Sequence, residues 1–311
     1  MRSYFTHGKV MLAGEYAVLA GVEALALPVK QGQWMHVWET ESTDESSKLI
    51  WQAKDQNEAV WFECRLDMNN LQLPESIELT EVAEVLVLLL KEIQSKQPQL
   101  FLNKTLRIET QCEFDRSYGL GTSSTLINNL SLWSGIDAFQ LQQIAFGGSG
   151  YDVAVGRMGR PVVYWMAHEQ PNWSSWQLSR ELTGQWYLVF PGNKQNSRHS
   201  LKDKTSAIAG IKKDAVLLQQ LNAIVQAIKN PRSLPLLEAM LEMWQALLSQ
   251  RLELPRAYDS LGITPVQGGL CKWLGAWGGD VLLVNEAVLM THYDAFEGMN
   301  RVAWNDFVLT E

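Results

Sequence analysis

The order of strand-like and helix-like segments constrains the fold of this chain most strongly. Residues 48–53 and 60–66 are rich in Trp, Ile, Val and Phe, which predicts two strands. A helix is expected after Thr80, where glutamates begin the segment and an apolar stripe follows. Two longer helices are expected near residues 204–229 and 233–250. Because strands and helices are mixed without regular βαβ alternation, the predicted fold class is α+β in two lobes.

Length and composition agree with a chain that packs one or two cores. The 311 residues are 46% hydrophobic, enough for one large domain or two ordinary ones. The polar residues 168–175, which include Pro171 and Asn172, form the candidate boundary. We therefore predict an N-terminal domain over residues 1–175 and a C-terminal domain over residues 176–311.

The net charge, the apolar runs and the cysteines limit the classes of function that this protein can have. The net charge of −8 argues against a generally basic nucleic-acid-binding surface, although a local basic patch remains open. The longest apolar run, residues 85–90, is too short to span a bilayer, and no apolar targeting segment is expected at the N-terminus. Cys64, Cys112 and Cys271 are scattered without CxxC spacing, so we expect reduced thiols in a cytoplasmic protein, with neither disulfides nor a zinc site.

A glycine-rich stretch, YGLGTSST at residues 118–125, precedes a helix expected over residues 123–133. The start of a helix offers unpaired N–H groups and a partial positive charge, and glycines allow an anion to approach the backbone. A glycine turn with a Ser or Thr cap explains the same residues, so both interpretations stay open here. The chain lacks GxxxxGK[ST], the third glycine of a dinucleotide fingerprint, and the HRD and DFG motifs of protein kinases.

Three further segments accompany this loop: GKVMLAGEYAVL at residues 8–19, GSGYDVA at 148–154 and KWLGAWGGD at 272–280. Together, and in this order, the four segments resemble the conserved motifs of the GHMP kinases, from residue 8 to about 285. One such segment is a weak signal, whereas four in order are specific. The resemblance implies a two-lobed fold, with an N-terminal lobe similar to the second domain of ribosomal protein S5 and a ferredoxin-like C-terminal lobe. It also implies ATP-dependent phosphoryl transfer to a small acceptor.

The resemblance implies a nucleotide site made from two glycine segments. In that family the middle loop wraps the ATP phosphates, and Mg²⁺ bridges them. Mevalonate kinases supply a metal-binding glutamate before the aspartate segment, but residues 139–146 contain no carboxylate here. Ser123 or Ser124 is therefore the expected protein ligand of the metal. The expected nucleotide-binding residues are Gly119, Leu120, Gly121, Thr122, Ser123, Ser124, Gly275, Ala276 and Gly278.

Two residues match catalytic positions of the family. Lys9 corresponds to a lysine near the transferred phosphate, and Asp152 to an aspartate that accepts or orients the proton of the acceptor hydroxyl. That chemistry requires a carboxylate within hydrogen-bond reach, kept ionised by a nearby cation such as Lys9. Without the resemblance, a solvated surface lysine and a turn aspartate would explain the two residues.

The remaining expected contacts concern the acceptor. The polar residues 192–204 follow a strand and carry several basic side chains in an otherwise acidic protein. They suit an anionic acceptor, although a solvated loop explains them equally well. The forms GEY and GSGYDVA favour phosphomevalonate first and mevalonate second. The expected acceptor-binding residues are Glu15, Tyr16, Ser149, Gly150, Lys194, Ser197, Arg198 and His199.

Two alternatives remain open at this point. The first is a GHMP kinase for another acceptor, such as a sugar or an amino alcohol. The second is a non-catalytic ATP-binding regulatory protein on the same scaffold, suggested by Trp277 at a usual glycine position and by the missing metal carboxylate. The expected partners are ATP and a small-molecule acceptor, without nucleic acid or membrane, in a monomer or homodimer.

Overall fold

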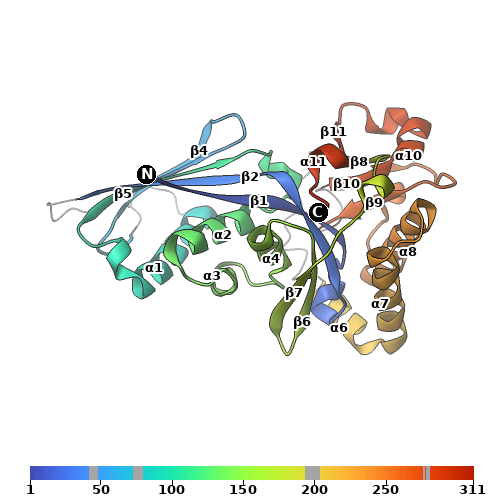
Figure 1. Cartoon of the computed structure of the whole chain (residues 1–311), viewed down its shortest axis with the longest axis horizontal. Coiled ribbons are helices and arrows are strands. Elements are labelled where there is room, and N and C mark those ends of the chain that lie inside the picture. Colours follow the sequence, from blue (N-terminus) through green and yellow to red (C-terminus); the bar gives the residue numbers. More distant parts are fainter. Residues whose placement is uncertain (42–47, 73–79, 193–203, 276, 278–280) are drawn as a thin grey trace. The chain divides into compact units, whose positions relative to one another are not determined.

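The computed structural model describes residues 1–41, 48–72, 80–192, 204–275, 277 and 281–311. Its contacts divide the chain into two compact units, each assembled from segments that are not contiguous in sequence (Figure 1). The first unit comprises Met1–Gly8, Gln31–Arg116 and Gly121–Val153. The second unit comprises Lys9–Lys30, Ser117–Leu120 and Ala154–Glu311. The division at residue 175 stays a prediction, because these units interleave along the chain.

The first unit is built on a mixed sheet. Its strands follow the order β4-β3-β5-β2, in which β3 and β5 are parallel and the other neighbours antiparallel. Strand β1 pairs with β2, and both strands contribute residues to both units. The strands are β1 (Arg2–Ala13), β2 (Ala24–Glu41), β3 (Lys48–Lys54), β4 (Val60–Asp67) and β5 (Lys104–Cys112).

Helices cover one face of this sheet. The helices α1 (Glu81–Lys96), α2 (Thr122–Ser134) and α3 (Ala138–Ala145) lie on the same side of β2 and β5 (Figure 1). Alternate strand residues such as Met35 and Val37 face these helices and join one buried apolar cluster. The period-two pattern of the strands therefore fixes which face of the sheet the helices cover.

The second unit contains a hairpin at the position of the predicted boundary. Strand β6 (Val162–Ala167) pairs with β7 (Gln170–Ser175), and β6 also pairs with the first residues of β2. His168 and Glu169 form the connecting turn with φ values of 51° and 61°. The polar residues 168–175 are therefore a two-residue turn followed by β7, and their polarity reflects the exposure of that strand.

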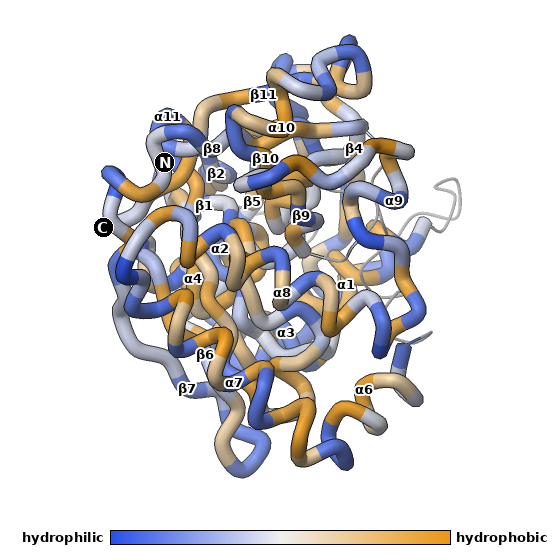
Figure 2. Tube along the Cα trace, turned by 90° about the vertical axis from the view of Figure 1, so that its right-hand side faces the viewer, coloured by the Kyte–Doolittle hydropathy of each residue, from blue (hydrophilic) through white to orange (hydrophobic). Residues whose placement is uncertain are grey.

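A four-stranded antiparallel sheet completes the second unit, in the order β11-β8-β10-β9. Every residue of the apolar strand β10 is buried, and the strand stands out as hydrophobic in Figure 2. The strands are β8 (Trp186–Phe190), β9 (Cys271–Leu274), β10 (Val281–Asn285) and β11 (Asn300–Ala303). The short helix α11 follows β11 directly.

The helices of the second unit differ from the expectation at one break. The single helix expected over residues 204–229 is two helices, α6 and α7, because Asp214 caps the second one by accepting a hydrogen bond from the amide of Leu217. The helices are α6 (Thr205–Lys213), α7 (Ala215–Lys229), α8 (Leu234–Leu252), α9 (Ala257–Leu261), α10 (Glu286–Thr291) and α11 (Trp304–Phe307). Helix α4 (Tyr151–Met158) begins in the first unit and ends in the second.

Short 3-10 turns complete the described structure: η1 (Ala17–Ala20), η2 (Pro98–Leu100), η3 (Arg116–Tyr118), η4 (Arg180–Leu182) and η5 (Tyr293–Phe296). Cys64, Cys112 and Cys271 are buried free thiols. Across the part of the chain that the structure describes, no helix is both long and apolar enough to cross a membrane.

Candidate active site

Helix α2 begins without a side-chain cap, directly after the glycine loop. Its first flanking residue, Gly121, has a φ of 91° and offers no side chain to the helix amides. In contrast, α1, α3, α7, α8 and α10 each begin at a residue whose side chain accepts a hydrogen bond from the first turn. Within the described residues, the backbone amides of Thr122, Ser123 and Ser124 donate no hydrogen bond to the protein. This end of α2 therefore suits an anion such as a phosphate.

The two serines predicted to bind a metal differ in accessibility. Ser124 is 2% exposed, and its hydroxyl donates a hydrogen bond to the carbonyl of Gly121 at 2.9 Å. Ser123 is exposed. Of the two hydroxyl groups, that of Ser123 is accordingly the one open to a ligand.

Buried polar side chains attach α2 to the sheet of the first unit. Asn129, fully buried, accepts a hydrogen bond from Thr6 at 2.8 Å and donates one to the carbonyl of Gln33 at 2.9 Å. The hydroxyl of Thr125 lies 3.2 Å from the side-chain oxygen of Gln33. Hydrogen bonds are directional, so this network sets the position of α2 more narrowly than apolar contact alone. The network was not predicted from the sequence, although two adjacent asparagines between the apolar residues Ile127 and Leu130 are a usable signal.

Asn128 connects α2 with the segment that carries Asp152. Its side-chain amide donates to the carbonyl of Ser124 at 3.1 Å and to the carbonyl of Val153 at 3.2 Å. Asp152 itself accepts a hydrogen bond from the amide of Val153 at 3.0 Å and is half-buried in the first turn of α4. The structure thus brings the helix that follows the glycine loop and the predicted catalytic aspartate together inside the first unit. Sequence analysis did not identify Asn128.

The glycines before Asp152 are held by glutamines in place of a carboxylate. Gln142 donates to the carbonyl of Gly147 at 3.0 Å, and Gln143 donates to that of Gly148 at 3.2 Å. Both glutamines belong to α3, the segment in which the metal-binding glutamate was absent from the sequence. Of the predicted acceptor residues in this turn, Ser149 is half-buried and Gly150 is buried with a φ of 80°. These glutamines therefore act as supports for the loop backbone.

In the second unit, Lys9 is hydrogen-bonded to Gly119 and Leu120, the residues of the glycine loop that precede Gly121. The backbone amide of Lys9 donates to the carbonyl of Leu120 at 2.9 Å, and its ammonium donates to the carbonyl of Gly119 at 2.8 Å. Lys9 is 8% exposed, so it is not a solvated surface lysine. The predicted catalytic lysine and these predicted nucleotide-binding residues are neighbours. Because Lys9 and Asp152 belong to different units, their mutual approach stays a prediction.

The GEY turn lies inside the second unit. Glu15 and Tyr16 are 2% and 6% exposed, and Tyr16 has an unusual φ of 57°. Gly14 has a φ of 116°, and a Cβ there would stand 2.3 Å from the Cβ of Ala24. Only glycine therefore fits at this crossing with β2. The carboxylate of Glu15 is ion-paired with Lys272 and accepts a hydrogen bond from the indole of Trp244.

Beyond strand β9, the structure describes Gly275 and Trp277 of the third glycine segment. Gly275 has a φ of 80° and is half-buried. Trp277 is 3% exposed, and its indole donates to the carbonyl of Pro255 at 2.6 Å, so the ring anchors this segment within the second unit. The other predicted residues of this segment and of the basic loop lie outside the described residues: Ala276, Gly278, Lys194, Ser197, Arg198 and His199.

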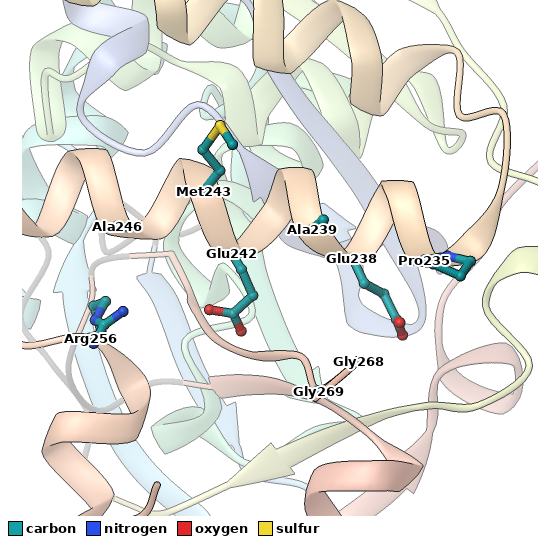
Figure 3. A pocket seen from close by; sticks show the side chains of 9 residues that line it. All are labelled: Pro235, Glu238, Ala239, Glu242, Met243, Ala246, Arg256, Gly268 and Gly269. Atoms are coloured by element: carbon teal, nitrogen blue, oxygen red, sulfur yellow. The ribbon is translucent and has the colours of Figure 1, made fainter. Parts of the chain in front are cut away.

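A cavity of about 460 Å³ in the second unit contains none of the predicted site residues (Figure 3). The carboxylates of Glu238 and Glu242 point from α8 toward the segment of Gly268 and Gly269. Burial raises the pKa of Glu242 to about 7, although the amide of Cys271 and the positive charges of Arg256 and Lys272 act in the opposite direction. Glu242 accepts the Cys271 amide at 2.7 Å, so this carboxylate supports β9.

The chain has the same overall fold as solved mevalonate and phosphomevalonate kinases. The chain aligns with the Methanococcus jannaschii mevalonate kinase at a TM-score of 0.67 and 14% identity, covering 100% of this chain and 98% of that one. It aligns with Streptococcus pneumoniae phosphomevalonate kinase, in complex with phosphomevalonate and AMPPNP, at a TM-score of 0.66 and 14% identity over 97% and 100% of the chains.

A sugar kinase has the same fold. Lactococcus lactis galactokinase, complexed with galactose, aligns at a TM-score of 0.64 and 10% identity, covering 99% of this chain and 93% of that one. No protein-family model matches the chain, and no curated protein matches it in sequence. At these identities the comparisons establish the fold, which kinases of different acceptors share.

Proposed function

We propose that this protein is an ATP-dependent small-molecule kinase that transfers the γ-phosphoryl group to a small anionic acceptor. One observation carries the proposal: helix α2 starts uncapped after left-handed glycines, and its first amides are open to an anion. The ammonium of Lys9, bound to the carbonyl of Gly119, lies beside the preceding half of the same loop. Backbone donors and a cation are the groups that bind a polyphosphate.

The residues fit the expected cofactors in part. The amides of Thr122, Ser123 and Ser124 would hold ATP phosphates, and the exposed Ser123 hydroxyl would contact the metal. Among the described residues, no group of three or more His, Cys, Asp or Glu side chains could hold a metal ion. The phosphates are therefore expected to supply most ligands of Mg²⁺, which would neutralise their charge when bound.

The chain's own residues would act mainly by positioning. Asp152 would accept a hydrogen bond from the acceptor hydroxyl and orient its oxygen, and Lys9 would balance the negative charge that gathers during transfer. Asn128 would keep the Asp152 segment fixed relative to α2. Alignment of the acceptor oxygen with the γ-phosphate, together with charge stabilisation, accounts for most of the rate gain in phosphoryl transfer, since no covalent enzyme intermediate is needed.

For the acceptor we propose phosphomevalonate first and mevalonate second. Support comes from the GEY and GSGYDVA segments and from the shared fold with a phosphomevalonate kinase that binds phosphomevalonate. The deciding experiment measures ADP release with phosphomevalonate, mevalonate, galactose and homoserine under the same conditions. The highest kcat/KM with phosphomevalonate supports the proposal, whereas a preference for galactose or homoserine identifies a different acceptor class.

A non-catalytic ATP-binding protein is the second candidate. It is favoured by Gln142 and Gln143, which lie in the helix at the place where mevalonate kinases carry a metal-binding glutamate. Binding of a non-hydrolysable ATP analogue without ADP release on any acceptor would support this candidate and refute the kinase.

A further inference from the structure

A fully buried ion pair joins segments at opposite ends of the second unit's sequence. The side chains of Glu15 and Lys272 are 1% and 0% exposed, and the two are in direct contact. The indole of Trp244 donates to the second oxygen of Glu15 at 2.7 Å. The Lys272 ammonium also donates to the carbonyl of Trp273 at 2.9 Å. One carboxylate therefore receives donors from both α8 and β9.

These contacts leave the carboxylate of Glu15 poorly available to an external ligand. Each carboxylate oxygen already accepts a hydrogen bond from a buried donor, and the residue is 2% exposed. A carboxylate that is enclosed and paired in this way is poorly placed to bind a soluble acceptor. This differs from the acceptor contact that the family resemblance implies for Glu15. Burying both charges is costly unless they stay together, so the pair imposes one arrangement on the segments that carry it.

The segments that carry Glu15 and Lys272 are each adjacent in sequence to a predicted site residue. Glu15 lies just beyond β1, the strand that presents Lys9, and Tyr16 next to it keeps an unusual φ of 57°. Such a backbone conformation persists only where its surroundings enforce it. Lys272 lies in β9, which continues to Gly275 of the third glycine segment. The ion pair thus links the strand of Lys9 to the strand that enters this segment.

Helix α8 keeps the Lys272 strand in a fixed position. Strand β9 is at the edge of the four-stranded sheet and pairs with β10 on one side. On the other side, Gln245 donates to the carbonyl of Cys271 at 2.8 Å and accepts from the amide of Trp273 at 3.1 Å. Glu242 accepts from the amide of Cys271. Because side chains of α8 bind the backbone on both sides of Lys272, the ammonium is presented to Glu15 from a rigid base.

We propose that Glu15 and Lys272 are positioning residues of the phosphoryl-transfer site: their buried ion pair holds the GEY turn, and with it the Lys9 strand, against β9. This inference rests on the proposed kinase function. It assigns Glu15 a structural partner within the protein and no contact with the acceptor.

The experiment uses Glu15→Gln, Lys272→Met and the double variant in the full chain. Each single change leaves one buried group without its charged partner, and we expect the melting temperature to fall by about 5–15 °C. We expect kcat to fall roughly ten- to a hundredfold, with KM for the acceptor within about twofold of wild type. The double variant removes both charges, and the amide oxygen introduced by Glu15→Gln can still accept from Trp244. It should recover most of the loss in melting temperature and in kcat.

Lys229→Met is the matched control, because Lys229 pairs with Glu23 at 2.9 Å in the same unit but is about one-fifth exposed. It should leave melting temperature and kcat close to wild type. An increase in acceptor KM for Glu15→Gln at unchanged melting temperature would overturn the proposal, because it indicates direct acceptor contact. Failure of the double variant to recover would overturn it as well. A wild-type protein without ADP release would instead refute the kinase function, while the melting temperatures would still report whether the pair is coupled.

Discussion

The ammonium of Lys9 donates a hydrogen bond to the carbonyl of Gly119 at 2.8 Å, which joins a buried lysine to the loop that precedes α2. Lysine is seldom buried without a functional or paired role, and one partner of the Lys9 ammonium is the carbonyl of Gly119 in the predicted phosphate loop. The cation is therefore retained beside the loop, where a bound polyphosphate would develop additional charge during transfer.

Replacing Lys9 should abolish most of the activity without unfolding the protein. Lys9→Met keeps the aliphatic stem within β1 but removes the cation, so we expect kcat to fall by about 10²–10³-fold. Steady-state kinetics and circular dichroism measure the two effects. Lys30→Met is the control, since Lys30 is exposed in the same unit. Near-normal kcat for Lys9→Met would remove Lys9 from the catalytic assignment.

Asp152→Asn separates the charge of Asp152 from its structural hydrogen bond. The amide oxygen of asparagine can still accept from the amide of Val153, so the first turn of α4 should persist. Loss of the proton-accepting carboxylate should lower kcat by about 10²–10⁴-fold. Asp137→Asn, which preserves the cap of α3, should retain wild-type kinetics. A kcat unchanged by Asp152→Asn would contradict the proposed role.

Asn128 is predicted to contribute through two buried hydrogen bonds. Asn128→Ala leaves the carbonyls of Ser124 and Val153 without this donor, so we expect a loss of about 1–3 kcal/mol in the free energy of unfolding. We also expect weaker binding of a non-hydrolysable ATP analogue, because the start of α2 loses a support.

Urea unfolding and calorimetric titration measure these two effects. Asn222→Ala is the control, because Asn222 makes the same type of bond to the carbonyl four residues before it but is half-buried. If both variants lose equal stability and keep nucleotide affinity, Asn128 has no special role at the site.

Glu242 should make stability depend on pH near neutrality. Its pKa rises from an ordinary 4.5 to about 7 in the folded state, chiefly through burial. The folded protein therefore retains a proton that the unfolded chain has lost, and the resulting stabilisation disappears as pH rises through about 7. Glu242→Gln should remove about 1–3 kcal/mol of the decline in unfolding free energy between pH 5 and pH 8.

Urea unfolding at several pH values, with the exposed Glu297→Gln as control, tests this dependence. The same pH slope in wild type and Glu242→Gln would show that another group is responsible.

Local pattern predicted much of the fold. The α+β class, the strand segments near residues 48–53 and 60–66 and the helix after Thr80 are confirmed, because each depends on side-chain periodicity and caps within a few residues. The break at Asp214 was missed, since an aspartate within a helical pattern is ambiguous until its side chain is seen to cap α7. The sequence did not indicate strand β7, because an exposed polar strand lacks the apolar alternation that identifies strands.

The residues of the site divide in the same way. The glycine loop, Lys9 and Asp152 could be selected from the order of four short motifs, because each motif encodes a local backbone shape. The bond from Asn128 to Val153 and the pairing of Glu15 with Lys272, 257 residues apart, came from the folded chain alone. Contacts of that kind depend on which distant segments pack together. The sequence around each of these residues does not indicate its partner.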